Sequence, residues 1–161
     1  MDFKKILIPL DGSRLSARAL DMVEPISGPE TQITLLSVID PPDFMTVESF
    51  PGQSMSTASS LSDSIVSAST EMSGELQTKA GQYLNHLAER LRVSGHPTNV
   101  IVEIGDPARI IVEVADQIKP DIIVMSTHGR SGITRWLLGS VTQKVLGMTQ
   151  YPVLVIPNPQ K

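Results

Sequence analysis

Short apolar runs alternate along this chain with segments in which apolar residues recur every three or four positions. The runs at residues 4–10, 32–39, 99–104, 122–125 and 153–156 have the length and β-rich composition of buried strands. The intervening periodicity predicts helices over residues 13–25, 74–93 and 141–148, and a fourth that Asp106 caps and Pro107 begins. Strands alternating with helices in this way are typical of a parallel sheet that is covered on both faces.

We therefore expect an α/β fold with a doubly wound, five-stranded parallel sheet and helices on both faces. Right-handed crossovers favour the strand order 3-2-1-4-5, with 2-1-3-4-5 as the alternative. Ligands of such sheets bind beyond the carboxyl ends of the strands, where the strand order reverses. In the first order this point lies between the first and fourth strands. The loop of residues 10–13 and the loop that begins at Ser126 then share one crevice.

One segment, at about residues 41–73, interrupts the regular alternation. It contains Pro41, Pro42 and Pro51 and is dense in serine. Connections longer than about 12–15 residues are usually functional lids or poorly ordered segments. We expect a single domain over residues 1–161 with a mobile or partly helical surface insertion here, in which residues 61–72 either belong to the insertion or extend the next helix. An ordered lid is the alternative.

Composition narrows the classes of function. The chain has 161 residues, 40% hydrophobic and 19% charged, which suits one soluble globular domain. A net charge of −4 and 4% aromatic residues argue against a nucleic-acid partner. Cysteine is absent, which excludes disulfides and thiolate metal sites. No apolar run approaches the roughly 18 residues of a membrane span, so we expect a cytoplasmic protein without a membrane partner.

The most informative loop is Ser-Thr-His-Gly-Arg-Ser-Gly, residues 126–132, with Leu-Gly-Ser-Val-Thr at residues 138–142. It joins a buried strand to a helix N-terminus, where backbone N–H groups and the helix dipole favour anions. Glycine at 129 and 139 lets the backbone approach phosphate oxygens, and Ser140 offers a hydroxyl and helix-cap geometry. Arg130 is either a phosphate ligand or a solvated cation. Alternatively, Gly139 and Ser140 only start a helix.

With these residues in view, the chain resembles the nucleotide-binding type of the universal stress protein family over essentially its whole length. The resemblance rests on Lys-Ile-Leu-Ile-Pro-Leu-Asp-Gly-Ser at 5–13, Leu-Leu-Ser-Val-Ile-Asp at 35–40, Gly-Asp-Pro at 105–107, and residues 126–141. The family's signature is a small residue, two residues, Gly, nine residues, then Gly-Ser or Gly-Thr. Ser126, Gly129, Gly139 and Ser140 occupy these positions. Ser126 stands where the ATP-binding members typically have glycine.

The resemblance implies ATP as the ligand, with Mg²⁺ held through its phosphates rather than by protein ligands alone. The implied nucleotide-binding residues are Pro9, Asp11, Val38, Met125, Ser126, Gly129, Arg130, Gly139, Ser140 and Val141. Pro9 and Val38 would line the base, Val38 with backbone groups. Asp11 suits ribose hydroxyls or a metal, and its alternative role is a helix N-cap. The resemblance also implies a homodimer through the last strand, Val153–Ile156.

Nothing in the sequence is arranged for catalysis. The chain has no P-loop, no Gly-x-Ser-x-Gly and no His-Glu-x-x-His, and no base is visible to activate water. We therefore expect no catalytic residues and at most weak ATP hydrolysis. The predicted function is that of an ATP-binding, nucleotide-dependent regulatory or stress-response protein. The alternatives are a nucleotide-free dimeric interaction module, which Ser126 keeps open, and a slow ATPase.

Overall fold

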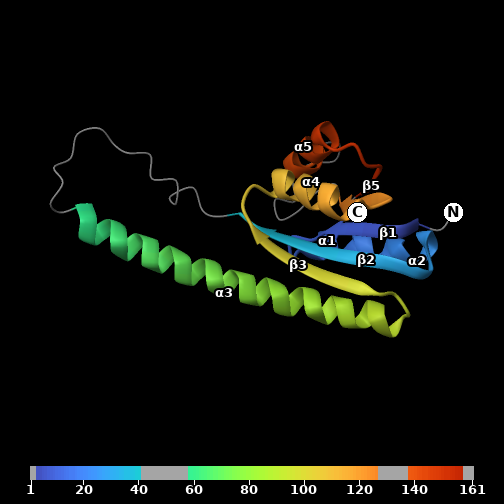
Figure 1. Cartoon of the computed structure of the whole chain (residues 1–161), viewed down its shortest axis with the longest axis horizontal. Coiled ribbons are helices and arrows are strands. Elements are labelled where there is room, and N and C mark those ends of the chain that lie inside the picture. Colours follow the sequence, from blue (N-terminus) through green and yellow to red (C-terminus); the bar gives the residue numbers. More distant parts are fainter. Residues whose placement is uncertain (1–2, 41–57, 127–137, 158–161) are drawn as a thin grey trace.

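A computed structural model of the chain describes residues 3–40, 58–126 and 138–157 (Figure 1). Its strands form one parallel sheet in the order β3-β2-β1-β4-β5. The strands are β1 (Phe3–Pro9), β2 (Ser27–Ile39), β3 (Thr98–Ile104), β4 (Ile122–Ser126) and β5 (Val153–Ile156). The predicted α/β class and the predicted strand order 3-2-1-4-5 are confirmed.

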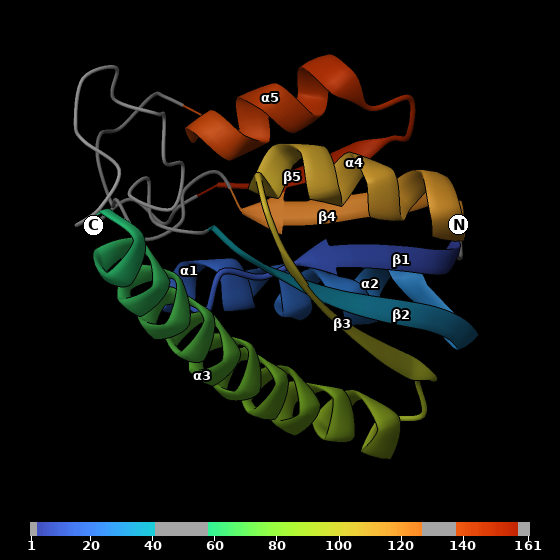
Figure 2. The ribbon, with the colours of Figure 1, turned by 60° about the vertical axis from the view of Figure 1, so that its left-hand side comes forward.

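Helices cover both faces of the sheet (Figure 2). Their bounds are α1 (Arg14–Ala17), the 3₁₀ helix η1 (Arg18–Met22), α2 (Val23–Ile26), α3 (Ala58–Val93), α4 (Pro107–Ile118) and α5 (Ser140–Met148). The segment from α1 to α2 lies with α3 on one face, and α4 lies with α5 on the other. No helix of the described part is long and apolar enough to cross a membrane.

Two apolar clusters fill the space between the sheet and its helices. Ile6, Ile8 and Leu10 of the first strand segment point into the cluster under α3, which we call the α3-side cluster. Leu7 points into the cluster under α4 and α5, which we call the α4-side cluster. This alternation is the period of two that a strand imposes on its side chains. Both faces of β1 are buried over residues 6–8, and this part of the strand is continuously apolar.

The helix expected over residues 13–25 is broken into three short pieces in the structure. Pro25 has no N–H group, and its ring conflicts with the carbonyl four residues earlier, so it is tolerated only in a helix's first turn. A new helix, α2, accordingly begins at Val23, and the preceding turn is a 3₁₀ helix. The second strand is also longer than expected, since it begins at Ser27.

Helix α3 shows which part of the expected insertion is helical. Helix α3 begins at Ala58, so residues 61–72 extend the predicted helix, while residues 41–57 lie outside the described residues. Leu84 and Leu87 are buried as expected, but Leu76 is 41% exposed. Figure 1 shows that the N-terminal part of α3 projects beyond the sheet, where no strand lies beneath it.

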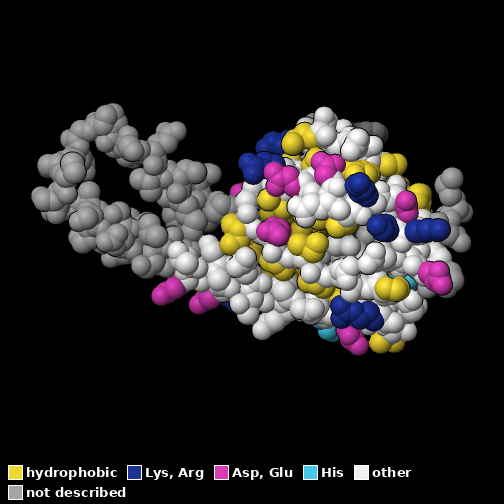
Figure 3. Space-filling model, viewed as in Figure 1, with side chains coloured by type: hydrophobic (Ala, Val, Ile, Leu, Met, Phe, Trp, Pro, Cys, Tyr) yellow, Lys and Arg dark blue, Asp and Glu magenta, His cyan; other side chains and the backbone are white. Residues whose placement is uncertain are grey.

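The edge strand β3 carries apolar side chains up to the molecular surface. In Figure 3, hydrophobic side chains gather in a band between α3 and α4. Val100 and Val102 pack partly buried against the α3-side cluster, and Ile101 packs against the α4-side cluster. The last residue of the strand, Ile104, is 39% exposed. Burial therefore thins out at the carboxyl end of this edge strand.

Candidate functional site

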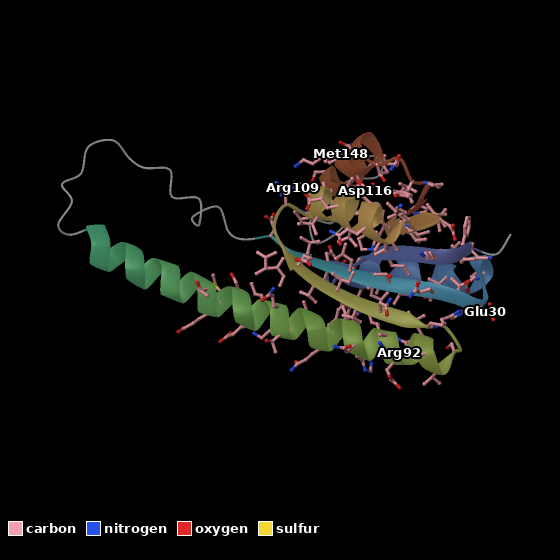
Figure 4. The ribbon with its side chains drawn as sticks, in the orientation of Figure 1. Glu30, Arg92, Arg109, Asp116 and Met148 are labelled. Carbon is pink, nitrogen blue, oxygen red and sulfur yellow. The ribbon has the colours of Figure 1, made fainter. Side chains whose placement is uncertain are left out.

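The candidate site lies at the carboxyl edge of the sheet, where β1 and β4 end side by side. β1 pairs with β2 on one side and with β4 on the other, so the strand order reverses between β1 and β4. In Figure 4, Arg109 in the first turn of α4 marks this edge, whereas Glu30 and Arg92 lie towards the opposite end. Ligands of doubly wound sheets bind at such a reversal.

Asp11 follows β1 in a tight turn with a defined hydrogen-bond pattern. Its Oδ1 accepts a hydrogen bond from the Ser13 N–H at 2.9 Å, and its own N–H donates to Ser16 Oγ at 3.3 Å. Between them, Gly12 has a φ of +80°, which favours glycine. Ser13 Oγ accepts from the Ser16 N–H at 3.1 Å, which is the N-cap bond of α1. The residue that caps this helix is therefore Ser13, and Asp11 orients the turn before it.

Tyr83 is a residue of this region that the sequence did not single out. It lies on α3, half-buried against the α3-side cluster, which also contains Leu10. Burial raises the pKa of the Tyr83 phenol, and the nearby Asp11 carboxylate raises it further. In the sequence Tyr83 is one member of an apolar helical stripe. Only the return of α3 from the carboxyl edge brings it towards Asp11.

The other side of the reversal is the start of α5. Gly139 occupies the N-cap position with φ −57° and ψ 152°, and no side chain caps the helix there. Ser140, which we expected to have helix-cap geometry, is instead the first residue of the helix. A glycine N-cap has no side-chain oxygen, so it leaves the N–H groups of the first turn available to another acceptor.

A buried hydroxyl joins the start of α5 to the end of β4. Thr142 is 3% exposed, and its Oγ1 donates a hydrogen bond to the Ser126 carbonyl oxygen at 3.0 Å. Ser126 itself is the last residue of β4, in register with Ile156 of β5, and its φ is negative. The backbone at this position therefore has a conformation that does not require glycine.

The neighbouring helix start, at residues 105–107, has the predicted capping structure. Asp106 is the N-cap of α4, Pro107 is its first residue, and Asp106 Oδ1 accepts from the Arg109 N–H at 2.9 Å. The Lys144 Nζ atom of α5 lies 3.6 Å from Asp106 Oδ2. The Arg109 N–H lowers the pKa of Asp106 against a smaller opposing effect of burial, and Lys144 lowers it further. This ion pair links the N-terminal halves of α4 and α5.

Those predicted nucleotide-binding residues that the structure describes lie at or near the carboxyl edge of the sheet. Pro9 ends β1, Val38 lies near the end of β2, and Ser126 ends β4. The residues from α5 and its cap are Gly139, Ser140 and Val141. The side chain of Met125 is buried in the α4-side cluster, and Val38 packs against the same cluster, so both can meet a ligand at this edge with backbone groups only. Gly129 and Arg130 lie outside the described residues.

Metal ligands do not gather here. Within residues 3–40, 58–126 and 138–157, no group of three or more His, Cys, Asp or Glu side chains is arranged to hold a metal ion. The described residues therefore offer backbone donors, one oriented carboxylate and apolar strand ends, which together suit an anionic ligand that also carries hydroxyl groups.

Comparison with known proteins now gives the family. The model of the universal stress protein family matches residues 2–157. The chain belongs to the universal stress protein family. Two universal stress proteins of Methanocaldococcus jannaschii are similar to it over nearly the whole length. One is 30% identical over 155 residues, covering 96% of this chain and 94% of the relative. The other is 32% identical over 171 residues, covering 99% and 85%.

Solved structures of universal stress proteins share the fold. The structure of the first of these M. jannaschii proteins matches with a TM-score of 0.82 and 27% identity, covering 100% of both chains. A family member from Arabidopsis thaliana with AMP bound matches with a TM-score of 0.64 and 18% identity, covering 97% of this chain and 92% of that one. A universal stress protein in complex with cAMP matches with a TM-score of 0.59 and 21% identity, covering 98% of both chains.

Proposed function

We propose that this universal stress protein binds an adenine nucleotide, ATP with Mg²⁺, at the carboxyl edge between β1 and β4. It acts as a nucleotide-dependent regulatory protein of the stress response, in the cytoplasm and as a single domain over residues 1–161. The observation that carries the proposal is one juxtaposition: the Asp11 turn and the uncapped start of α5 lie at the same reversal of strand order.

The phosphates of the proposed ligand would lie against the start of α5. The N–H groups of a helix's first turn have no partner within the helix, and the helix dipole makes them a favourable anion site. Gly139 adds no side chain at the point of closest approach, and Ser140 and Val141 supply the first amides. Gly129 and Arg130 complete the proposed phosphate loop. Mg²⁺ would bind through phosphate oxygens.

The nucleoside would lie across the ends of β1 and β2. The Asp11 carboxylate accepts hydrogen bonds, which is what ribose hydroxyls require, and the Ser13 N–H already orients it. Pro9 would contact the base, and Val38 and Met125 would contribute backbone groups because their side chains pack in the α4-side cluster. The AMP and cAMP complexes of other family members support an adenine nucleotide as the class of ligand.

The last strand supports a homodimer as part of this proposal. β5 is the edge of the sheet, paired with β4 on one side. Three of its four residues are only half-buried: Val153, Leu154 and Val155. An apolar edge strand needs cover, and pairing with the same strand of a second copy supplies it. If the chain forms this dimer and holds no nucleotide, the alternative of a nucleotide-free interaction module applies.

The test is to purify the protein, denature it and chromatograph the small molecules that it releases. We expect adenine nucleotide in near-stoichiometric yield. ATP and Mg²⁺ at about 100 times the dissociation constant would raise the free energy of unfolding by about 2.7 kcal/mol, measurable as a higher melting temperature. Release of no nucleotide, together with an unchanged melting temperature, would contradict the proposal and favour the nucleotide-free module.

A pair of glycine variants on the same helix localises the site. Gly139→Val should abolish nucleotide retention, because its side chain occupies the phosphate approach, while the backbone angles at 139 remain accessible to any residue. Gly147→Val is the matched control: a Cβ at this position meets no atom within 4 Å, at the far end of α5. Wild-type retention by Gly139→Val, in protein that unfolds cooperatively, would refute the assignment of the phosphates to this loop.

A further inference from the structure

Helix α3 carries one apolar stripe that extends beyond its contact with the sheet. Apolar residues recur along it in pairs four positions apart, and the pairs repeat every eleven residues: Leu61 and Ile65, Met72 and Leu76, Tyr83 and Leu87. Eleven residues make three turns of a helix, so the three pairs occupy one line along α3. The last pair packs on the sheet, because Tyr83 and Leu87 both belong to the α3-side cluster.

The middle pair of this stripe is left exposed. Met72 and Leu76 are each 41% exposed. Tyr83 is the first described residue of α3 that packs against the α3-side cluster, and we call the helix before it, residues 58–82, the α3 arm. Figure 1 shows the arm projecting beyond the sheet. Since a helix in a protein is stabilised mainly by the packing of its apolar face, the stripe requires an occupant other than the sheet.

The chain itself supplies a segment that must pass along the arm. Strand β2 ends at Ile39 at the carboxyl edge of the sheet, whereas α3 begins at Ala58 at the far tip of the arm (Figure 1). Residues 41–57, which lie outside the described residues, therefore connect the base of the arm to its tip. The arm is about 36 Å long. The connection can span at most about 60 Å, so it can follow the whole arm without being fully extended.

This connection has the composition that such a contact needs. Its apolar residues are Phe44, Met45, Val47, Phe50 and Met55. Two of the three phenylalanines of the chain are therefore in this stretch. The connection runs from the base of the arm to its tip, and α3 runs from the tip to the base, so the two are antiparallel. An early residue of the connection such as Phe44 then falls at the level of Met72 and Leu76.

We propose that residues 41–57 dock along the apolar stripe of the α3 arm, with Phe44 against Met72 and Leu76. The inference is independent of the proposed nucleotide site. A segment tethered at both ends is held beside the arm at an effective concentration on the order of millimolar, so it occupies the stripe ahead of a second copy of the chain. The arm is then an intramolecular docking surface and part of the folded domain.

The first test uses engineered disulfides, because the chain has no cysteine that would interfere. We compare Phe44→Cys combined with Leu76→Cys against Phe44→Cys combined with Thr78→Cys, both oxidised at low protein concentration and separated on a non-reducing gel. Thr78 is exposed and is the matched control. It is two positions from Leu76 but lies on the other side of the helix, since successive residues turn by about 100°. We expect an intramolecular disulfide in the first protein and its loss in the second.

Hydrogen exchange tests the contact without a new bond. Leu76→Gln keeps a similar helix propensity and should speed amide exchange in residues 58–76 by about tenfold, the scale of uncovering one leucine side chain. Thr78→Ser should leave the exchange unchanged. Equal disulfide formation with Leu76→Cys and Thr78→Cys would overturn the proposal, as would unchanged exchange in Leu76→Gln. Disulfides that form between two molecules would also overturn it and assign the stripe to a second copy.

Discussion

The Thr142 hydroxyl donates a hydrogen bond to the Ser126 carbonyl oxygen at 3.0 Å, and so ties the first turn of α5 to the last residue of β4. Sixteen positions separate the two residues in the sequence. The contact holds the two ends of the glycine-rich loop in a fixed relation, whatever path the loop takes between them. The edge of the sheet that we propose for the phosphates therefore has a buried hydrogen bond on its inner side.

We predict that Thr142→Val lowers the free energy of unfolding by about 1–2 kcal/mol, because valine keeps the shape of the side chain and removes a buried donor. Chemical denaturation measures this. Thr78→Val is the control: Thr78 Oγ1 donates to the Gly74 carbonyl on an exposed part of α3, where water can replace it. An equal loss in both variants would contradict a special role for the buried contact.

A second prediction concerns Asp106, the N-cap of α4. Asp106→Ala should cost about 1 kcal/mol at neutral pH, the usual value of such a cap. The pKa of Asp106 is lowered in the folded state, so its contribution is complete above the unfolded value of about 3.9. The contribution is lost as the pH falls through the folded pKa, and the two proteins should converge in stability there.

Asp106→Asn separates the charge from the cap, and denaturation at several pH values measures both. Asparagine is an equally good N-cap, so this variant should keep most of the stability and lose most of the pH dependence that Asp106 contributes. A difference between wild type and Asp106→Ala that stays constant down to pH 2 would rule out this linkage.

A third prediction concerns Lys119, which ends α4 in the left-handed conformation with φ 51° and ψ 67°. Among the described residues it is the one non-glycine residue with a positive φ. Lys119→Gly should raise the free energy of unfolding by about 0.5–1 kcal/mol, because glycine adopts this conformation without strain from a Cβ. Lys119→Ala keeps the Cβ and should give no gain. Equal melting temperatures for the glycine and alanine variants would contradict this account.

Much of the fold follows from local pattern. The continuous apolar run of β4 indicated burial on both faces, and two adjacent residues, Asp106 and Pro107, indicated where a helix starts. Two predictions made from the apolar periodicity of helices were wrong. Pro25 breaks a helix whose apolar stripe looked continuous, and Leu76 lies on the predicted apolar stripe of α3 but is 41% exposed.

Some features of the candidate site could likewise be predicted from the sequence, and others could not. The sequence by itself determined the alternation of strands and helices, the loops that follow the first and fourth strands, and the residues of the glycine-rich signature, because these depend on short-range periodicity and spacing. It left two strand orders open, and the structure decided between them. Only the tertiary structure decided that Ser13 rather than Asp11 caps α1, that Thr142 holds Ser126, and that α3 brings Tyr83 near enough to Asp11 for the carboxylate charge to raise the pKa of the phenol. Such contacts join residues far apart in the chain, and no local pattern of hydrophobic and polar positions specifies which side chains meet across a packed layer.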